Sequence, residues 1–541
     1  MCRRTYLAIG LLVLLAFALR AVSLDGQSLW RDEVDALRFA NAPLTELKAR
    51  FTMAGWNGPL YHLLLRGWIT LAGTSEYGLR FLSLWFGVIC VALTYVLGRH
   101  LFGSIVGALG ALLVSTAPYL VWYGREAKMY TLVSALALLA IYALRRAVEG
   151  AGRCWWAVQI LATSFAFYSH ILAALLIPVQ VLLYLLWWPD ARRQWVGGLS
   201  SLACLTLPYL PLLIWQWPLV FRARETGFYP YSLGEMGEIL LYAWSLGLVA
   251  SSGLENGLMR AAMAGLALLG LVNTLIPSGP AGRWGYEGSD GRSVARDRNW
   301  FRSVGSGLAP AIWLLLPYLA IGIVSTWQPL FTDRYLIWSA PAFYLLVALG
   351  LVSLLRLRKW GVWLTGLIVS LLLVANGVNV WRQVAIPIKS DFRSAAAFVT
   401  DYDETPRSGL AMEPPVGRYP LSIYFPMVLD EATDKVLVIF QIPHGRYVFD
   451  YYVPGGVYDW ADGYYTNYRD ASGGYEVSPA EHAAYMDSVT AGYDVVWLVL
   501  TEAEMWDDRG LTREWLEANG RRLDEAHFTR VDVYRYRLDR S

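Results

Sequence analysis

The chain has 541 residues, of which 56 % are hydrophobic and 16 % are charged. A soluble protein normally carries about a quarter charged residues, so this composition argues against a soluble globular protein. The net charge of +2 gives no sign of the basic surface that a nucleic-acid-binding protein needs, and we expect no nucleic-acid partner. The four cysteines have no metal-ligand spacing, and we expect neither a metal site nor a disulfide framework.

Long apolar runs account for this composition, and several reach the roughly 20 residues that span the hydrocarbon of a bilayer. We predict about eleven transmembrane helices, the first of them an uncleaved helix rather than a signal peptide. They lie near residues 5–22, 80–98, 104–120, 129–145, 154–169, 171–188, 195–217, 258–276, 308–325, 335–355 and 360–381. The predicted fold class is an α-helical polytopic membrane protein with external interfacial helices and a C-terminal extracytoplasmic α/β domain.

Positively charged residues concentrate in alternate loops of this scheme, which is the pattern of cytoplasmic loops. Among them are Arg3, Arg4, Arg145, Arg146, Arg192, Arg193, Arg356 and Arg358. We therefore expect a multi-pass protein of the plasma (inner) membrane. Its N-terminus would lie in the cytoplasm, and the chain from about residue 382 would lie on the extracytoplasmic side.

Two further apolar stretches, residues 59–72 and 235–253, would break this alternation if they crossed the membrane. In the first, His62, Arg66 and Thr70 recur every four residues and share one helical face, which suits a helix lying in the membrane interface. We predict that both stretches are external interfacial helices. The alternative, that either one is a true span, would invert the orientation of everything that follows it.

The C-terminal part of the sequence changes character, and we divide the chain into a transmembrane domain, 1–381, and an extracytoplasmic α/β domain, 382–541. Ser478, Pro479 and Glu481 predict a capped helix start. Three further elements are predicted: a buried strand at 495–500, a short helix at 511–520 closed by Gly520, and a strand at 528–537. The stretch 447–475 is rich in tyrosine, which either stacks on sugar rings or packs a long loop.

The sharpest local signal is the acidic pair Asp32 and Glu33 in SLWRDEVDALRFA, residues 28–40, directly after the first span. A carboxylate at the membrane surface can act as a general base, because partial burial and neighbouring charges tune its pKa. The two carboxylates can equally cap a helix, since the positive end of a helix favours them there. The residues alone leave both interpretations open.

Two more signals fall at the expected external ends of spans. Arg125, Glu126 and Lys128 lie in WYGREAKMY, residues 122–130, where charges close to hydrocarbon call for a pairing or a ligand. The alternative is that the two cations snorkel to the interface with Glu126 as their counter-ion. His170 lies in FYSHILAALL between two spans, and it is either functional or a satisfied structural group.

The last signal is TDRYLIWSAPA, residues 332–342, at another external helix start. The guanidinium of Arg334 offers planar, permanently charged donors that suit a phosphate. The alternative is an ion pair with Asp333 or with another external carboxylate. Together the four segments would place carboxylates and cations on one face of the membrane, as a phosphate-bearing lipid donor and a hydroxyl acceptor require.

The order of these motifs resembles the multi-span (C-type fold) glycosyltransferases of the protein O-mannosyltransferase and lipid A aminoarabinose-transferase superfamily. The resemblance covers roughly residues 5–360 and rests on RDEVDALRFA, GPLYHLLLRGWITLAGTSEYGLRFLSLWFG, GRHLFG, WYGREAKMY, FYSH and DRYL. In the protein mannosyltransferases a characteristic external domain is inserted between spans. This chain has its own region at 382–541 instead, so sugar and acceptor stay open.

The resemblance implies an inverting transferase that moves a sugar from a polyprenyl-phosphate donor to an acceptor hydroxyl of a protein, glycan or lipid, with membrane lipids as its surroundings. It implies no required cofactor. Carried over by position, Asp32 would be the base with Glu33 in support, and Arg334, Arg125 and Lys128 would bind the donor phosphate. The residues implied to line the cavity are Glu126, His170, His62 and Tyr335. A lipid or sugar transporter or flippase is the alternative function.

Overall fold

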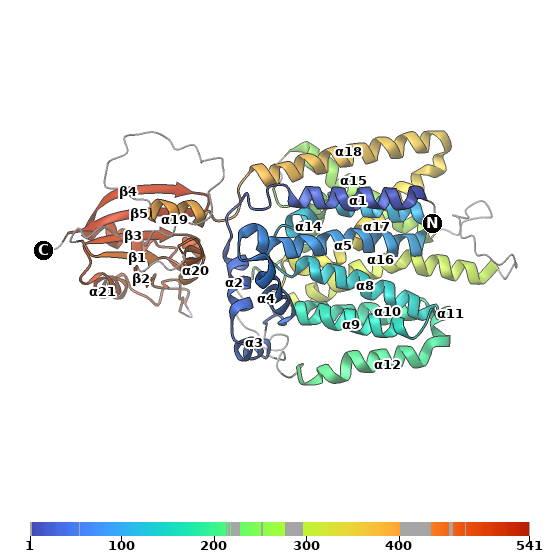
Figure 1. The fold of residues 1–541 in the computed structure, drawn as a ribbon, viewed down its shortest axis with the longest axis horizontal. Coiled ribbons are helices and arrows are strands. Elements are labelled where there is room, and N and C mark those ends of the chain that lie inside the picture. The colour runs from blue at the N-terminus through green and yellow to red at the C-terminus, as the bar shows by residue number, and fades with distance from the viewer. Residues whose placement is uncertain are drawn as a thin grey trace. The chain divides into compact units, whose positions relative to one another are not determined.

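The structure is a computed structural model that describes residues 3–53, 55–212, 214, 217, 228–249, 253–275, 296–400, 434–453, 458–470 and 472–539. The chain forms two compact units. The first comprises Met1–Leu24 and Ala36–Ile386, and the second comprises Asp25–Asp35 and Pro387–Ser541. The first unit is helical and the second contains a β-sheet (Figure 1).

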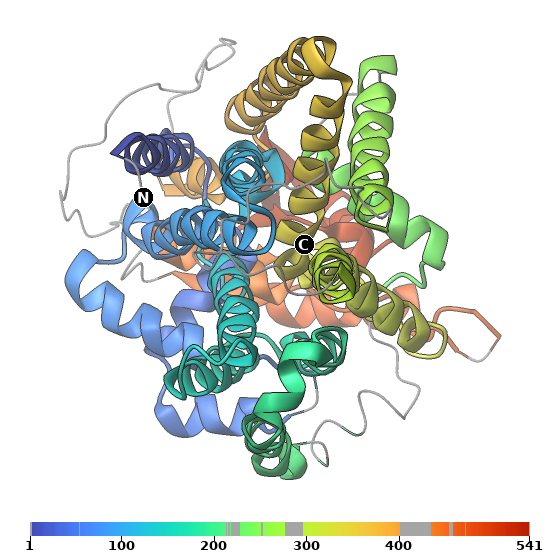
Figure 2. The same cartoon turned by 90° about the vertical axis from the view of Figure 1, so that its right-hand side faces the viewer.

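The first unit is a bundle whose long helices run side by side (Figure 1) and are seen nearly end-on from the side (Figure 2). Its α-helices are α1 (Arg3–Ala21), α2 (Arg31–Asn41, which begins in the second unit), α3 (Leu44–Phe51), α4 (Leu60–Ala72), α5 (Glu76–Phe102), α6 (Ser104–Thr116), α7 (Pro118–Tyr123), α8 (Tyr130–Val148), α9 (Cys154–Ser169), α10 (Leu176–Leu186), α11 (Trp188–Ala191), α12 (Trp195–Thr206), α14 (Leu233–Leu246), α15 (Leu254–Leu275), α16 (Arg296–Ser325), α17 (Ala340–Leu354) and α18 (Arg358–Ala385). Short 3₁₀ segments are η1 (Ile171–Leu175), η2 (Arg192–Gln194), η3 (Leu207–Tyr209), η4 (Asp333–Ser339) and η5 (Leu355–Leu357).

A helix lies at each of the eleven predicted spans, and the chain is a multi-pass membrane protein. Within the described residues, seven helical segments are long and apolar enough to cross a membrane. They are Glu76–Phe102, Tyr130–Val148, Trp188–Leu212, Glu255–Leu275, Gly307–Ser325, Asp333–Leu357 and Lys359–Ala385. Shorter apolar helices cover Tyr6–Ala21, Ser104–Thr116 and Ile171–Leu186. The end of the predicted span 195–217 lies partly outside the described residues.

Burial separates interior helices of the bundle from peripheral ones. In α8 and in the segment Asp333–Leu357, 78 % and 67 % of the apolar window is buried, whereas in Lys359–Ala385 only 22 % is buried. Large apolar side chains such as Trp363 and Leu371 are exposed on α18. A large apolar surface exposed to water would promote aggregation, whereas the same surface is compatible with the hydrocarbon chains of a bilayer. The exposed face of α18 is therefore suited to contact lipid.

Small residues let two of these helices approach closely. A β-carbon at Gly270 on α15 would lie 2.1 Å from the carbonyl oxygen of Leu346, and one at Gly350 on α17 would lie 2.0 Å from that of Leu266. Helices in a bilayer associate largely through van der Waals packing, and small residues at the interface permit the close contact. The pairing of α15 with α17 therefore depends on these two glycines.

The two stretches predicted as interfacial helices are α4 and α14, with 13 and 14 residues. Both are shorter than the roughly 20 residues that a helix needs to cross hydrocarbon. Ser232 and Glu235 form a reciprocal capping box at the start of α14, which explains an acidic residue at the edge of an apolar stretch. Since α6, at a predicted span, also has only 13 residues, length does not separate the two kinds of helix, and the interfacial position of α4 and α14 stays a prediction.

The second unit contains a five-stranded sheet in the order β2-β1-β3-β5-β4. Its strands are β1 (Val436–Phe440), β2 (Asp459–Asp462), β3 (Val495–Leu500), β4 (Gly520–Phe528) and β5 (Val531–Leu538). Its helices are α19 (Phe392–Thr400), α20 (Pro443–Tyr452), α21 (Pro479–Thr490), α22 (Ala503–Trp506) and α23 (Leu511–Asn519). β1 pairs in parallel with β2 and β3, and β5 pairs antiparallel with β3 and β4.

Helices cover both faces of this sheet. Successive side chains of a strand point to opposite faces, so each strand offers side chains for packing on both. On one face, Ile439 and Leu498 pack with Met486 of α21 and Leu516 of α23. On the other face, Phe398 of α19 lies 5.7 Å from Trp497, and Phe449 of α20 lies 5.3 Å from Phe440, between ring centroids. The predicted fold class, a polytopic helical membrane protein with a C-terminal α/β region, is confirmed.

Local predictions in the second unit succeed in part. The capping box of Ser478 and Glu481 starts α21, and the strand at 495–500 is β3. The predicted strand at 528–537 corresponds to β5 but begins three residues later, because Thr529 and Arg530, with a φ of 55° at Arg530, form the turn that joins β4 to β5. Gly520 does end a helix, but its extended backbone, with a φ of −160°, begins β4.

The orientation of the bundle can be tested with its natural cysteines. Cys154 is exposed at the start of α9, at an end that the charge pattern assigns to the cytoplasm. We expect a membrane-impermeant maleimide to label Cys154 in inverted vesicles and not in right-side-out vesicles, because the reagent does not cross hydrocarbon. Cys2 and Cys204 are replaced by serine so that the label reports one site.

Ser488→Cys on the exposed face of α21 is the matched control, and it should label in right-side-out vesicles alone. Labelling of Cys154 from the outer side would reverse the predicted orientation.

Candidate functional site

The acidic pair Asp32 and Glu33 occupies the first turn of α2, within the part of the chain that belongs to the second unit. The carbonyl of Trp30 accepts hydrogen bonds from the backbone amides of Glu33 and Val34, at 3.0 and 3.1 Å, which begins the helix. Carboxylates are favoured at this end of a helix by its dipole. The two carboxylates therefore do lie at a helix start, as one of the two interpretations predicted. This position does not exclude a catalytic role.

The two carboxylates differ in their surroundings. Glu33 is fully buried, and its Oε2 lies 2.8 Å from the Nζ of Lys389, whose side chain is 5 % exposed. Asp32 is only half-buried. A buried ion pair of this kind leaves Glu33 poorly placed to exchange protons with a substrate, whereas Asp32 retains partial access to solvent. Sequence reasoning missed Lys389, because no local pattern links residues 356 positions apart.

In the first unit, side-chain hydrogen bonds hold the segment 124–129 between α7 and α8. The indole of Trp122 donates to Oε1 of Glu126 at 2.8 Å, and Glu126 is 1 % exposed. The guanidinium of Arg125 donates to the carbonyl of Ser23. The hydroxyl of Ser83 donates to the carbonyl of Lys128 at 2.8 Å. The three predicted charged residues thus lie in an ordered connection between helices.

Arg20 of α1 supports the same segment from the interior. Its guanidinium donates to the carbonyls of Ser115 and Val114, at 3.0 and 3.2 Å, near the end of α6. A β-carbon at Gly124 would lie 2.9 Å from the Cδ of Arg20, so a larger residue there would displace Arg20 or the turn after α7. Arg20 thereby satisfies helix-end carbonyls that would otherwise be unpaired in an apolar interior.

His170 and Arg334, which are far apart in sequence, are neighbours in the first unit. His170 is 3 % exposed between α9 and η1, and its ring centroid lies 5.0 Å from that of Tyr335 and 6.4 Å from that of Tyr130. Burial, together with the positive charge of Arg334, lowers the pKa of His170 to about 3. His170 is therefore a neutral imidazole at physiological pH.

The imidazole of His170 has a defined hydrogen-bonding state. Its Nδ1 accepts a hydrogen bond from the amide of Leu172 at 3.3 Å, so in the neutral ring the proton resides on Nε2. Among the described residues, Nε2 finds no hydrogen-bond partner although it is buried. This N–H can donate to a ligand oxygen.

Two other predicted residues have identifiable neighbours. His62 on α4 packs edge-on against Phe39, at 5.4 Å between ring centroids, and burial together with the charge of Lys128 lowers its pKa to about 3. The carboxylate of Asp333 accepts hydrogen bonds from Tyr123 at 3.1 Å and from Thr332 at 3.3 Å. Asp333 is thus engaged by hydroxyl groups, which the sequence did not indicate.

The first unit therefore brings His170, Tyr335 and Arg334 together, and it brings His62 close to Lys128. Asp32 and Glu33 belong to the second unit. The catalytic, phosphate-binding and cavity-lining roles assigned to these residues stay predictions. The described residues contain no group of three or more histidine, cysteine, aspartate or glutamate side chains that could hold a metal ion, and independence from metal also stays a prediction.

The tyrosines of the stretch 447–475 pack largely against protein. Contrary to the expected long loop, three of them, Tyr447, Tyr451 and Tyr452, lie on α20. The guanidinium groups of Arg469 and Arg509 lie 3.4 and 3.9 Å from the ring centroid of Tyr475. These contacts favour structural packing over sugar stacking.

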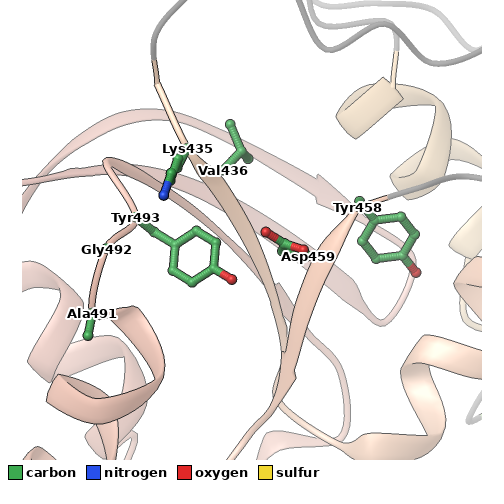
Figure 3. Close-up of a pocket in the computed structure, with 7 residues that line it drawn as sticks. All are labelled: Lys435, Val436, Tyr458, Asp459, Ala491, Gly492 and Tyr493. Atoms are coloured by element: carbon green, nitrogen blue, oxygen red, sulfur yellow. The ribbon is translucent and has the colours of Figure 1, made fainter.

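The second unit contains a pocket of about 410 Å³, and Figure 3 shows the residues that line it. Its lining residues are Lys435, Val436, Tyr458, Asp459, Ala491, Gly492 and Tyr493. Val436 and Asp459 are the first residues of β1 and β2, so the pocket lies at the amino ends of the parallel strands. Ligands of open α/β sheets bind at the carboxyl ends, and we assign this pocket no role in the reaction.

Comparisons with known proteins agree with this architecture. The family described as dolichyl-phosphate-mannose-protein mannosyltransferase matches residues 57–215. No curated protein matches the sequence significantly. One similar solved structure is ArnT from Cupriavidus metallidurans bound to undecaprenyl phosphate, with a TM-score of 0.53 and 13 % identity over 97 % of this chain and 97 % of that chain.

A second is the archaeal oligosaccharyltransferase AglB from Archaeoglobus fulgidus, in complex with an inhibitory peptide and a dolichol-phosphate. Its TM-score is 0.56 at 11 % identity, over 98 % of this chain and 74 % of that chain. Identities this low concern the fold. The resemblance drawn from the motifs is thereby confirmed: the chain has the C-type fold of the multi-span glycosyltransferases.

The pKa of His170 predicts a dependence of stability on pH. On acidification from pH 7 to pH 5, a histidine in the unfolded chain, with a pKa near 6.5, takes up a proton, and the folded His170 does not. Protonation therefore favours the unfolded state by about 2 kcal/mol at pH 5. We expect the apparent unfolding temperature of His170→Asn in detergent to fall less between pH 7 and pH 5 than that of the parent.

The matched control is His527→Asn, because the side chain of His527 is 59 % exposed. Between pH 7 and pH 5, the apparent unfolding temperature of His527→Asn should fall by as much as that of the parent. An equal fall for parent and His170→Asn would show that His170 is protonated in the folded protein.

Proposed function

We propose that the protein is an inverting glycosyltransferase that moves a sugar from a polyprenyl-phosphate donor to an acceptor hydroxyl on the extracytoplasmic face of the plasma (inner) membrane. The observation that carries the proposal is a fold similar, over 97 % of this chain, to a structure bound to undecaprenyl phosphate. The match of residues 57–215 to a dolichyl-phosphate-mannose-dependent family supports the same donor chemistry. The domain assignment 1–381 and 382–541 is part of the proposal.

Donor binding is assigned to the cations of the first unit. Arg334, Arg125 and Lys128 would bind the phosphate, since a guanidinium donates two parallel hydrogen bonds to phosphate oxygens. His170, neutral and with its Nε2–H available, would donate to an oxygen of the same ligand. Glu126, His62 and Tyr335 would line the cavity around it. Positive charge at the departing phosphate stabilises the negative charge that develops there.

Transfer is assigned to a single in-line displacement. The acceptor oxygen forms a bond to the anomeric carbon of the sugar while the bond from that carbon to the phosphate oxygen breaks, so the configuration inverts. Asp32 takes the proton of the acceptor hydroxyl, and Glu33 supports Asp32. Polyprenyl phosphate leaves as an anion, which requires neither a strong general acid nor a cofactor.

Removal of the proposed base should abolish transfer. In Asp32→Asn the amide nitrogen cannot accept the acceptor's proton, and we expect the transfer rate to fall by about 10²- to 10⁴-fold, with donor affinity retained. The measurement is the transfer rate together with the binding of labelled donor to the purified protein. Asp25→Asn, at an exposed position of the same unit, is the matched control. A parent-like rate in Asp32→Asn would remove the assignment of the base.

The charge of Arg334 should be needed for donor binding. We expect Arg334→Ala to weaken donor binding by about tenfold or more, because a hydrogen bond to a charged group contributes roughly 1.5–3 kcal/mol. Arg334→Lys should lose less, since it keeps the charge. Donor affinity is measured by displacement of a labelled lipid-linked sugar.

Arg356→Ala, an exposed arginine at the end of a different helical segment, is the control and should bind donor normally. Equal donor affinity in the parent, Arg334→Ala and Arg334→Lys would exclude Arg334 from the donor site.

A further inference from the structure

Lys389 and Glu33 form a charged contact that none of the sequence motifs indicates. Both side chains are buried, at 5 % and 0 % exposure, and the Nζ–Oε2 distance is 2.8 Å. Both residues belong to the second unit. Removing one partner of a buried ion pair leaves an uncompensated charge and is strongly destabilising. The pair therefore constrains the position of Glu33, and with it the first turn of α2.

Further hydrogen bonds fasten the chain on both sides of this pair. The side-chain oxygen of Gln27 accepts from the amides of Ile388 and Lys389, at 3.1 and 3.3 Å. The side chain of Arg393 donates to the carbonyl of Asp25 at 2.8 Å. Residues 25–33 are thus bonded along their length to residues 388–393.

A tyrosine of α20 adds a second attachment. The hydroxyl of Tyr452 accepts a hydrogen bond from the amide of Leu29 at 2.6 Å and lies 3.1 Å from the hydroxyl of Ser28. Lys389 also lies 6.0 Å from the ring centroid of Trp30. The segment that leads into Asp32 therefore has little freedom of its own.

These contacts separate the roles of the two adjacent carboxylates. Glu33 is fully buried and bonded to Lys389, whereas the neighbouring Asp32 is half-buried at the same helix start. In a first helical turn, a fixed Glu33 fixes the backbone of Asp32 as well. Proton transfer depends on placing the base within hydrogen-bond reach of its proton, and small displacements are costly.

We propose that Lys389 is a positioning residue for transfer: its buried ion pair with Glu33 holds the turn that carries Asp32. The C-terminal region would then contribute directly to the placement of the base. This inference rests on the proposed function, because positioning matters only if Asp32 is the base. The pairing itself can be tested without any activity.

The test compares Lys389→Met with Lys389→Arg and with Lys435→Met, an exposed lysine of the same unit. Hydrogen–deuterium exchange of peptides covering residues 25–35 is measured in the purified, full-length protein. We expect exchange of these amides to rise by tenfold or more in Lys389→Met. It should stay parent-like in Lys435→Met and be largely restored in Lys389→Arg.

Kinetics give the second readout. In Lys389→Met the kcat should fall by tenfold or more while the KM for the lipid-linked donor changes by less than threefold. The acidic limb of the pH–rate profile should also move to higher pH, because loss of the positive charge of Lys389 disfavours the charged form of a neighbouring base. The other charged groups around this turn include Arg31, Asp35, Arg393 and, near Arg31, Glu502, and all of them are unchanged in both Lys389 variants.

A second variant, in which both charges are removed, keeps the proposal testable if Lys389→Met does not fold. Glu33→Gln combined with Lys389→Met buries no unpaired charge, so it should fold, exchange faster than the parent at 25–35 and transfer slowly. Parent-like exchange and kcat in this double variant, or in Lys389→Met, would overturn the proposal. A parent protein that transfers no sugar from any lipid-linked donor would refute the proposed function, while the exchange data would still decide whether Lys389 holds the turn.

Discussion

The structure depends on one constraint: a charged group in hydrocarbon is costly, so charges must lie at helix ends or find partners inside the protein. Arg125, Glu126 and Lys128 lie between α7 and α8, and Arg334 lies at the start of η4. His170, also between helices, stays in the bundle as a neutral ring. The apolar helices thus hold the candidate donor-binding groups in the connections between them.

Interior charges obey the same constraint through long-range partners. Arg20 is fully buried and donates to carbonyls near the end of α6, and the close approach of Gly124 to Arg20 sets the path of the chain into the segment 124–129. In the second unit, the charge of Glu33 is met by Lys389. In both places an ion pair or a hydrogen-bond network lies directly beside a candidate functional segment.

Sequence patterns predicted what depends on local chemistry. Apolar length located the helices at all eleven predicted spans, and the capping box at Ser478 and Glu481 located α21. The motifs also indicated the residues that the first unit brings together around His170 and Tyr335. Contacts set by tertiary structure were not predictable: Lys389 joins Glu33 across 356 positions, and Tyr123 binds Asp333 across 210. Strand β4 was missed because GRRLDEAHF is too polar to show a buried face, and its pairing with β5 determines its conformation.

The most direct test of the account is a single-turnover experiment with the purified protein and a panel of polyprenyl-phosphate-linked sugars in the presence of candidate hydroxyl acceptors. An inverting glycosyltransferase should release free polyprenyl phosphate, together with a glycosylated acceptor of inverted anomeric configuration, from at least one donor. Movement of an intact lipid-linked sugar across a vesicle membrane, with no bond to phosphate broken for any donor, would contradict this function and establish a flippase instead.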